Sequence, residues 1–356
     1  MTTILIKDSL RQSVEAASNG LQTVLYTAKG QPTFVNVLEK FDMSTIDVNL
    51  SGVHPAFIIN GVTKDKLFIG TYQGVVRNGE FLSLPNQAAS TAMLDSLIAN
   101  VRANGAGHHL ITNAEWSAIA LKTWKDNTQP LGNTYFGRSV EDATQFGRRI
   151  DGLDASTGIT NGTNAGTLTG SGPVKWRHNQ KYNGISDLGG NGAQYCTGLR
   201  VYGGEIQIID NNNAALATAD LSATSALWKA IHAETGELIT PDGTGTTANS
   251  VKLANSGTAD YTLVMTNFDA FSTLKNASTT KPVSATALNK LKMLGIFPIS
   301  TSSLNDDGFG FSTNQSEYVC LRAGGVSAGI RAGIFFTTLA SGRVGLASSR
   351  PCYYTP

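Results

Sequence analysis

Two amphipathic helices in direct succession, with strand-type runs on both sides, constrain the fold of this chain most. The first is predicted over residues 90–104, ends at Gly105, and carries apolar residues at helical spacing: Leu94, Leu97, Ile98 and Val101. The second begins at Thr112, and Glu115 three residues later completes a capping box. Because each helix has one apolar face, we expect both to pack against a common sheet.

Strand and turn patterns surround these helices and predict an α+β fold. Asn78–Gly79 follows strand-type residues 67–77 and is typical of a type I′ hairpin turn, and Gly203–Gly204 divides a second hairpin over residues 198–210. Further helices are expected around residues 223–234 and 285–294. The end of the chain, residues 318–354, is predicted to hold short strands at each end with Gly-rich coil between them.

The chain divides into a small first unit and a large main domain. Residues 1–50 read as a helix-strand unit, whose helix over 9–20 has Ser9 and Gln12 at capping-box spacing. This unit is too small for a good core of its own, so we expect it to dock on the main domain or on a partner subunit. Residues 51–356 form the main domain, with a polar insertion at about 211–285.

Composition argues against several classes of function. The net charge is +1, and the 27 basic residues are spread along the chain, so we expect no nucleic-acid partner. No apolar run approaches the length of a membrane span, and residues 1–8 lack the pattern of a secretory signal. Charged residues make up 15% and glycines number 38, which favours a loop-rich globular protein.

Three cysteines, Cys196, Cys320 and Cys352, are too few and too widely spaced for a CxxC metal site or a disulfide framework. Two readings stay open: all three are free and buried, or Cys320 and Cys352 form a bridge. His108 and His109 have no third ligand at useful spacing, so we expect no metal and no cofactor.

Four segments carry a family resemblance: "HPAFIINGV" from His54, "GHHLITNAEWSAIAL" from Gly107, "GSGPVKWRHNQKYNGISDLGGN" from Gly170, and "LRAGG…AGIFF…SSRPC" from Leu321. In kind and in order they resemble the variable proteins of phages and prokaryotes that diversity-generating retroelements diversify. The resemblance covers residues 54–354, which is most of the chain. It implies a C-type-lectin-like fold of the version found in formylglycine-generating enzymes.

The family's C-terminal segment crosses the ligand face as coil, and a retroelement varies its outward side chains. The Arg-Gly-Gly opening of that segment falls on Arg322, Ala323 and Gly324, with Ala323 departing from the pattern. Inward anchors are then expected at Ala332, Ile334, Phe335 and Leu339. The closing Gly-Phe-Arg matches only as Ser348–Ser349–Arg350, so the register after Ser341 is open by one to three residues. The positions implied to face a ligand are Gly325, Ser327, Ala328, Ile330, Arg331, Phe336, Thr338, Ala340, Ser341, Val344 and Leu346. For the apolar members Ile330, Phe336, Val344 and Leu346 core packing is the alternative, and among them Phe336 is the first candidate for burial.

The resemblance implies a non-catalytic receptor-binding protein of a phage tail, which binds a protein or glycan on the host surface. A homotrimer, contacts with other virion proteins, and a location in the virion or in the host cytoplasm before assembly are expected with it. The alternatives are an oxidoreductase of the formylglycine-generating type and a purely structural virion protein. The first requires a close cysteine pair, whereas Cys320 and Cys352 stand far apart in sequence. Calcium-dependent sugar binding is not expected, because Gln129–Pro130–Leu131 lacks the second amide or carboxylate.

Several other residues are expected to be structural. Trp116, Trp124 and Trp176 are assigned to the core, and Asp187 to an Asx-type cap that accepts backbone amides. Arg331 and Arg343 either form a solvated pair or offer donors to a carboxylate or sulfate of a receptor.

Overall fold

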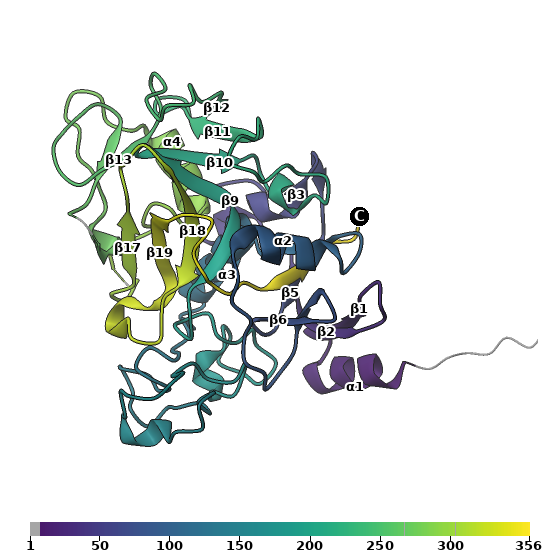
Figure 1. Cartoon of the computed structure of the whole chain (residues 1–356). Helices are drawn as coiled ribbons and strands as arrows, with labels where there is room; N and C mark the ends of the chain where they lie inside the picture. The colour runs from purple at the N-terminus through teal and green to yellow at the C-terminus, as the bar shows by residue number, and fades with distance from the viewer. Residues whose placement is uncertain (1–7, 267, 303) are drawn as a thin grey trace, which may run out of the picture.

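The computed structural model describes residues 8–266, 268–302 and 304–356, which fold as a mixed α+β protein (Figure 1). Sheet dominates, and four α-helices accompany it within this described part: α1 (Ser9–Ser18), α2 (Leu94–Arg102), α3 (Asn113–Lys125) and α4 (Ala285–Met293). None of these helices is both long and apolar enough to cross a membrane.

A five-stranded antiparallel sheet joins the two ends of the chain. Its order is β1 (Gln22–Tyr26), β2 (Pro32–Glu39), β5 (Lys66–Gly70), β20 (Pro351–Tyr353) and β8 (His108–Leu110). The last strand therefore lies between β5 and β8, where Cys352 pairs with Ile69 on one side and His109 on the other. The β1–β2 hairpin extends this sheet, so residues 8–50 dock on the rest of the chain.

A larger sheet of eleven strands forms the body of the molecule. Its main path is β15 (Asp269–Ala270), β17 (Gly308–Phe311), β19 (Gly333–Ser341), β18 (Glu317–Ala323), β9 (Gln194–Tyr202), β10 (Glu205–Ile209), β13 (Lys252–Ala254), β14 (Thr262–Val264) and β16 (Lys275–Asn276). Strand β10 also pairs with β11 (Trp228–Ile231), which pairs with β12 (Leu238–Ile239). Two hairpins stand apart: β3 (Ile58–Ile59) with β4 (Val62–Thr63), and β6 (Gly74–Arg77) with β7 (Glu80–Ser83).

The large sheet is covered on both faces. On one face α3 packs against β9 and β19, and the indole nitrogen of Trp116 donates to the carbonyl oxygen of Ile334 at 2.7 Å. On the other face the apolar stripe of α2 packs with Val319 and Leu321 of β18. Successive residues of a strand point to opposite faces, which places Cys320 and Arg322 on the α3 side. We call the opposite side, with Val319 and Leu321, the front face.

Most of the local sequence signals predict their elements correctly. Thr112 and Glu115 form the expected capping box, and Asn78 and Gly79 have the positive φ angles of a type I′ turn, 52° and 76°. The helix at the N-terminus is present, but Asp8 caps it by accepting the amide of Arg11, so the expected role of Ser9 as cap is wrong.

The helix predicted at 223–234 is also wrong. The segment holds a short loop and strand β11, because Trp228–Ile231 completes the edge of β10 and buries Trp228 and Ile231 against the sheet. Residues 126–190 contain only short 3₁₀ turns and isolated bridges, and Figure 1 shows them as a lobe of loops below the large sheet.

Candidate ligand-binding face

Strand β19 divides the C-terminal segment into two coils, residues 324–332 and 342–350. The expectation of continuous coil between the end strands is therefore wrong. Residues 333–341 pair with β18 on one edge and run parallel to β17 on the other, so their backbone groups are satisfied by neighbours far away in sequence.

The register of β19 decides which of its side chains reach the front face. Thr338 pairs with Leu321, which faces front, and Thr337 pairs with Arg322, which faces α3. Phe336, Thr338 and Ala340 therefore share the front face, since cross-strand partners lie on the same side of a sheet. The expected anchors Ala332, Ile334, Phe335 and Leu339 are all buried.

The candidate positions differ in exposure. Five are exposed: Ser327, Ile330, Ala340, Val344 and Leu346. Five are half-buried: Gly325, Ala328, Arg331, Thr338 and Ser341. Phe336 is the exception, because only 7% of it is exposed, so of the two alternatives for this residue the structure shows core packing.

A phenylalanine from the insertion covers Phe336. The ring of Phe268 lies 5.8 Å from that of Phe336 and is itself 49% exposed. It packs over Gly308 and Gly310 of β17, where any Cβ would collide with it. Phe268 therefore belongs to the candidate face, although nothing in its local sequence marks it, because only the pairing of β17 with β19 brings it there.

Backbone hydrogen bonds hold the first coil. The carbonyl oxygen of Val326 accepts the amide of Phe136 at 2.7 Å, and the amide of Gly329 donates to Thr134 at 3.0 Å. Both partners belong to the lobe of loops. Neither bond depends on the side chains that the coil carries, so this backbone keeps its position when exposed side chains change.

The second coil is held in the same way by α2 and β9. The carbonyl oxygen of Arg343 accepts the amide of Leu94 at 3.1 Å, and that of Gly345 accepts the hydroxyl of Tyr195 at 2.7 Å. Ser348 continues the contact through its amide, which donates to Ala193 at 3.1 Å. The exposed side chains of Val344 and Leu346 extend from this fixed backbone, beside the exposed Met93 at the start of α2.

Arg331 and Arg343, the two partly exposed arginines of the segment, each have a carboxylate partner. Arg331 lies 2.9 Å from Asp269 and donates to the carbonyl oxygen of Asp306. Arg343 lies 2.5 Å from Asp95 and 3.6 Å from Glu317. The two arginines therefore do not pair with each other, and each connects the segment to the framework.

Ala323 opens the segment in an unusual conformation. It is fully buried with a φ of 75°, a region that favours glycine, and a β-bulge separates it from Arg322. The next residue, Gly324, has a φ of 86°, and a Cβ there would lie 2.9 Å from that of Ala332. The backbone thus turns sharply out of the sheet at the position where the family pattern has its glycines.

Three buried groups that metals can bind meet at the five-stranded sheet, where His109 comes from β8 and Cys352 from β20. His109, Glu115 and Cys352 place one ligand atom each within 4.8 Å of one another. Sequence spacing missed this cluster, because Cys352 comes from the last strand. His109 Nε2 lies 2.7 Å from Glu115, and its Nδ1 lies 3.0 Å from the carbonyl oxygen of Gly107. A metal ion would have to displace the His109–Glu115 contact, which already stabilises both groups.

The three cysteines are free and buried, so the reading with a Cys320–Cys352 bridge is wrong. Cys196 pairs across the sheet with Cys320. Burial raises the pKa of all three thiols, which lowers the population of the nucleophilic thiolate.

The framework residues have structural roles. Trp116 and Trp176 are buried in the core, and Trp124 is half-buried. Asp187 has a structural role, but not as the expected local Asx-type cap: it accepts the amide of Gly170, seventeen residues earlier, at 2.8 Å, and burial raises the pKa of this carboxyl. Arg350, fully buried, donates to carbonyl oxygens of Gly70 and Ser186.

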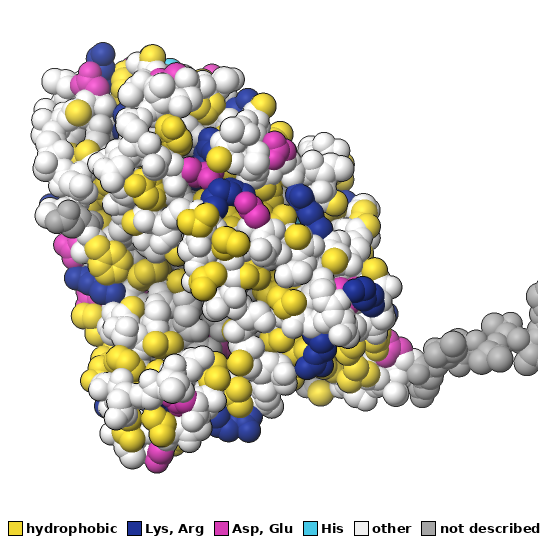
Figure 2. Space-filling model, viewed as in Figure 1, with side chains coloured by type: hydrophobic (Ala, Val, Ile, Leu, Met, Phe, Trp, Pro, Cys, Tyr) yellow, Lys and Arg dark blue, Asp and Glu magenta, His cyan; other side chains and the backbone are white. Residues whose placement is uncertain are grey.

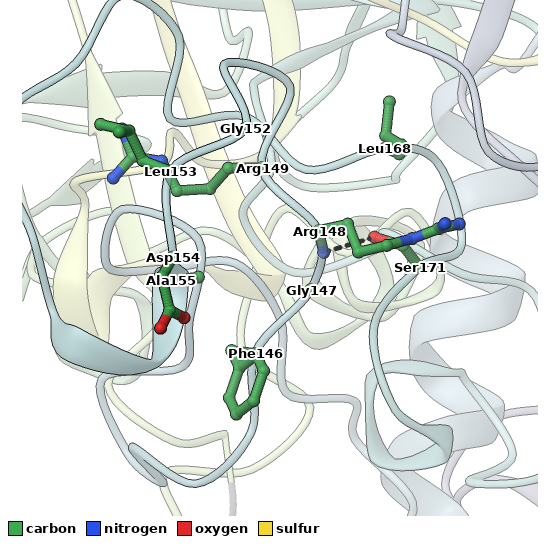
Figure 3. Close-up of a pocket in the computed structure, with 10 residues that line it drawn as sticks. All are labelled: Phe146, Gly147, Arg148, Arg149, Gly152, Leu153, Asp154, Ala155, Leu168 and Ser171. Atoms are coloured by element: carbon green, nitrogen blue, oxygen red, sulfur yellow. Dashed lines mark hydrogen bonds between the residues drawn. The ribbon is translucent and has the colours of Figure 1, made fainter.

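A hollow of about 540 Å³ opens on the lobe of loops (Figure 3). Phe146 and Leu153, both partly exposed, form apolar walls, and Asp154 stands between them. In Figure 3 the Arg148 side chain points away from Phe146, while its amide donates to the hydroxyl of Ser171 at 3.0 Å.

Comparison with protein-family models and with curated protein sequences finds no match for this chain. The function is therefore inferred from its own residues.

Proposed function

We propose that this protein is a non-catalytic, receptor-binding display protein with a C-type-lectin-like fold, of the kind that phages carry on their tails. Its ligand face consists of the two coils, residues 324–332 and 342–350, with the front-facing side chains of β19 between them. We call this surface the display face.

The observation that carries the proposal is the separation of backbone from side chains in these coils. Fixed neighbours, such as Thr134, Phe136, Leu94 and Tyr195, hold the backbone through its own polar groups. Exposed side chains of both coils make few contacts, so Ile330 is 49%, Val344 79% and Leu346 74% exposed. Such a surface can change its side chains without loss of the fold, which a diversified receptor-binding face requires.

The arrangement of the sheets and helices supports the assignment of a C-type-lectin-like fold. The resemblance implies a mostly antiparallel core, two flanking helices and a C-terminal segment held between core strands. Here the sheets are mostly antiparallel, α2 and α3 cover opposite faces, and β20 lies between β5 and β8. Exposed apolar side chains that gather in one patch are typical of interaction sites, and Val344 and Leu346 lie two residues apart in the second coil.

Binding at one display face is expected to be modest. About a dozen side chains cover less area than the roughly 800 Å² per partner of a standard interface. Display of several copies, as in a trimer on a virion, would raise the apparent affinity by about a hundredfold or more through avidity.

A four-residue variant tests the proposal: Ser327→Asp, Ile330→Ser, Val344→Ser and Leu346→Ser. The measurement is adsorption of labelled protein to a panel of bacterial strains. Adsorption should fall at least tenfold, while the melting temperature changes by less than about 3 °C, because none of the four side chains is buried. The matched control replaces two apolar residues exposed elsewhere, Val48 (89% exposed) and Tyr182 (86%), with serine.

Two outcomes would contradict the proposal. Unchanged adsorption of the four-residue variant would favour a structural virion protein, and loss of folding would mean that the coils carry stability. The neighbouring DNA offers an independent check. A near-identical copy of the codons for residues 322–350, beside a reverse transcriptase, is expected.

A further inference from the structure

A second hollow, of about 570 Å³, opens at the edge of the front face over β9, β10 and β11. This volume lies within the range of small-molecule sites, roughly 300–1,000 Å³. The insertion supplies two rims, residues 223–226 and 240–243, and Arg200, Tyr202, Gln207 and Trp228 come from the strands. Three hydroxyl-bearing residues, Thr224, Ser225 and Thr240, also belong to the lining.

Arg200 is the central feature of this hollow, because it is 7% exposed and still has donor capacity left. Its Nε donates to Gln207 at 2.8 Å, and its Nη1 donates to the carbonyl oxygen of Ala223 at 2.6 Å and to Glu317 at 3.0 Å. Its Nη2 has no acceptor among the described residues. A buried guanidinium with one free edge is a donor prepared for an oxyanion.

Two aromatic rings fix the orientation of this guanidinium. The Arg200 Cζ lies 4.4 Å from the ring centroid of Trp228 and 6.0 Å from that of Tyr202. Trp228 is held in turn, since its indole nitrogen donates to the carbonyl oxygen of Ser222 at 3.0 Å. The free edge of Arg200 therefore has a set direction before any ligand arrives, which reduces the entropy lost on binding.

The charges of the lining favour an anion. Arg200 and Lys229 belong to the lining, and none of the ten other lining residues is acidic. Asp242 stands on the rim between Pro241 and Gly243, but its carboxylate already accepts the amide of Thr244 and the hydroxyl of Thr246.

Lys229 pairs with Ile208, whose side chain belongs to the core on the α3 side, so the Lys229 side chain leaves β11 on the face opposite to Trp228. Arg200 therefore carries the positive charge of the hollow. Glu317, which pairs with Arg200, is shared with Arg343 and so does not belong to Arg200 alone.

The same Glu317 connects the hollow to the display face. One of its oxygens lies 3.0 Å from Arg200 Nη1, and the other lies 3.6 Å from Arg343 Nη1 in the second coil. Val344, exposed, follows Arg343 directly. Figure 2 shows basic and acidic side chains side by side near the middle of this view, with small groups of hydrophobic side chains around them.

We propose that this hollow is a fixed subsite for an acidic sugar unit, whose carboxylate or phosphate binds the free edge of Arg200 while its hydroxyl groups meet the Thr and Ser side chains of the rims. The inference rests on the proposed display function in one respect: the sugar unit belongs to a surface polymer that continues over Val344 and Leu346. The display face then supplies contacts that change with its side chains, beside the contact that Arg200 makes in the hollow.

Three probes test the subsite with the intact 356-residue chain: glucuronate, glycerol 3-phosphate and glucose. Binding is followed by NMR through the indole N–H signals, since the chain has four tryptophans and Trp228 lies in the hollow. We expect glucuronate or glycerol 3-phosphate to shift the Trp228 signal with a Kd of about millimolar, and glucose to have no effect. The anion that binds more tightly identifies the acidic group of the polymer.

Two variants and a control locate the binding. Arg200→Lys keeps the charge but removes the free guanidinium edge, and should weaken binding at least tenfold. Thr240→Trp, at an exposed rim position, should obstruct the hollow without touching Arg200, and covers the case in which Arg200→Lys fails to fold. Arg148→Gln, an arginine of the other hollow, should bind like the parent protein.

Equal shifts with glucose and glucuronate, or binding retained by folded Arg200→Lys and Thr240→Trp, would overturn the subsite. Its failure is distinguishable from failure of the display function. The four-residue variant leaves the hollow intact, so it should still bind the anionic probe. If that variant also adsorbs to cells like the parent protein, the display function fails and the subsite remains.

Discussion

Asp307 Oδ2 lies 2.7 Å from the amide nitrogen of Phe335, so a buried carboxyl group holds the start of β19 in place. Burial raises the pKa of Asp307 to about 8; the Phe335 amide acts in the opposite direction, and the nearby Glu141 and Asp306 raise it further. The anchor of the display face is thus an ionisable group that no cation neutralises directly among the described residues.

Stability is expected to fall with rising pH because of Asp307. The unfolded carboxyl titrates near 3.8 and the folded one near 8, so the folded state holds an extra proton between these values. The stabilisation is complete below about pH 4 and is lost as pH rises through 8. In Asp307→Asn this contribution is absent, and the decrease in the free energy of unfolding from pH 5 to pH 8 should be smaller by about 1–3 kcal/mol.

Urea unfolding of both proteins at pH 5, 6.5 and 8 measures this difference. The His109–Glu115 pair titrates in both proteins, so it cancels in the comparison. Parallel pH curves for parent and variant would show that Asp307 does not change its protonation in this range.

Gly333 is expected to tolerate no side chain. A Cβ at Gly333 would lie 1.9 Å from Asp307 Oδ1, and the carboxyl cannot move without losing the Phe335 amide. Gly333→Ala should therefore lower the free energy of unfolding by about 2 kcal/mol or more. Gly325→Ala is the matched control, because its Cβ meets nothing within 4 Å and should change stability by less than about 0.5 kcal/mol. Similar losses in both variants would refute this role of Gly333.

The sequence predicts well those elements that are determined by residues close together in the chain. The capping box of Thr112 and Glu115 and the Asn78–Gly79 turn depend on residues three positions apart or fewer. Strand β19 depends instead on β17, which lies more than twenty residues earlier. Its own sequence is a weak strand signal, because six glycines lie between residues 324 and 345. The helix predicted at 223–234 failed for the same reason, because the edge of β10 offers Trp228–Ile231 a sheet partner.

The candidate face was predictable only in part. The spacing of inward anchors and outward positions follows from the family pattern, which placed Ala332 and Leu339 inside and Val344 outside. Phe268 and Arg200 could not be found in this way. Both reach the front face through strand pairings between distant segments, and neither lies in a recognisable motif.

Ala323→Gly should be tolerated better than Ala332→Gly. Both alanines are buried and both variants lose one methyl group, but Ala323 has a φ of 75° whereas Ala332 has a φ of −77°. Relief of the left-handed conformation should favour Ala323→Gly by about 1 kcal/mol relative to Ala332→Gly. Thermal or urea unfolding of the two variants measures the difference, and equal losses would mean that the turn at Ala323 is not strained.

Removal of either partner of the buried His109–Glu115 pair should be costly. The carboxylate raises the pKa of His109 against the opposing effect of burial, so the folded state favours an imidazolium there. Glu115→Gln keeps an acceptor for the cap but leaves the imidazole without its counter-charge, and should destabilise by about 3 kcal/mol. His109→Gln combined with Glu115→Gln should recover part of that loss in a double-mutant cycle. Additive losses would show that the pair is not coupled.

The reactivity of the three cysteines with a thiol reagent distinguishes free cysteines from bridged ones. Cys196, Cys320 and Cys352 are each at most 2% exposed, and burial raises the pKa of each thiol, so a thiol reagent should reach them only after local or global opening. The native protein should react at least about a hundredfold more slowly than a small free thiol, and three thiols should react in denaturant. A single reactive thiol in denaturant would mean that two cysteines are bridged. Fast reaction of the native protein would mean that at least one thiol is at the surface, and would favour the alternative function as an oxidoreductase of the formylglycine-generating type.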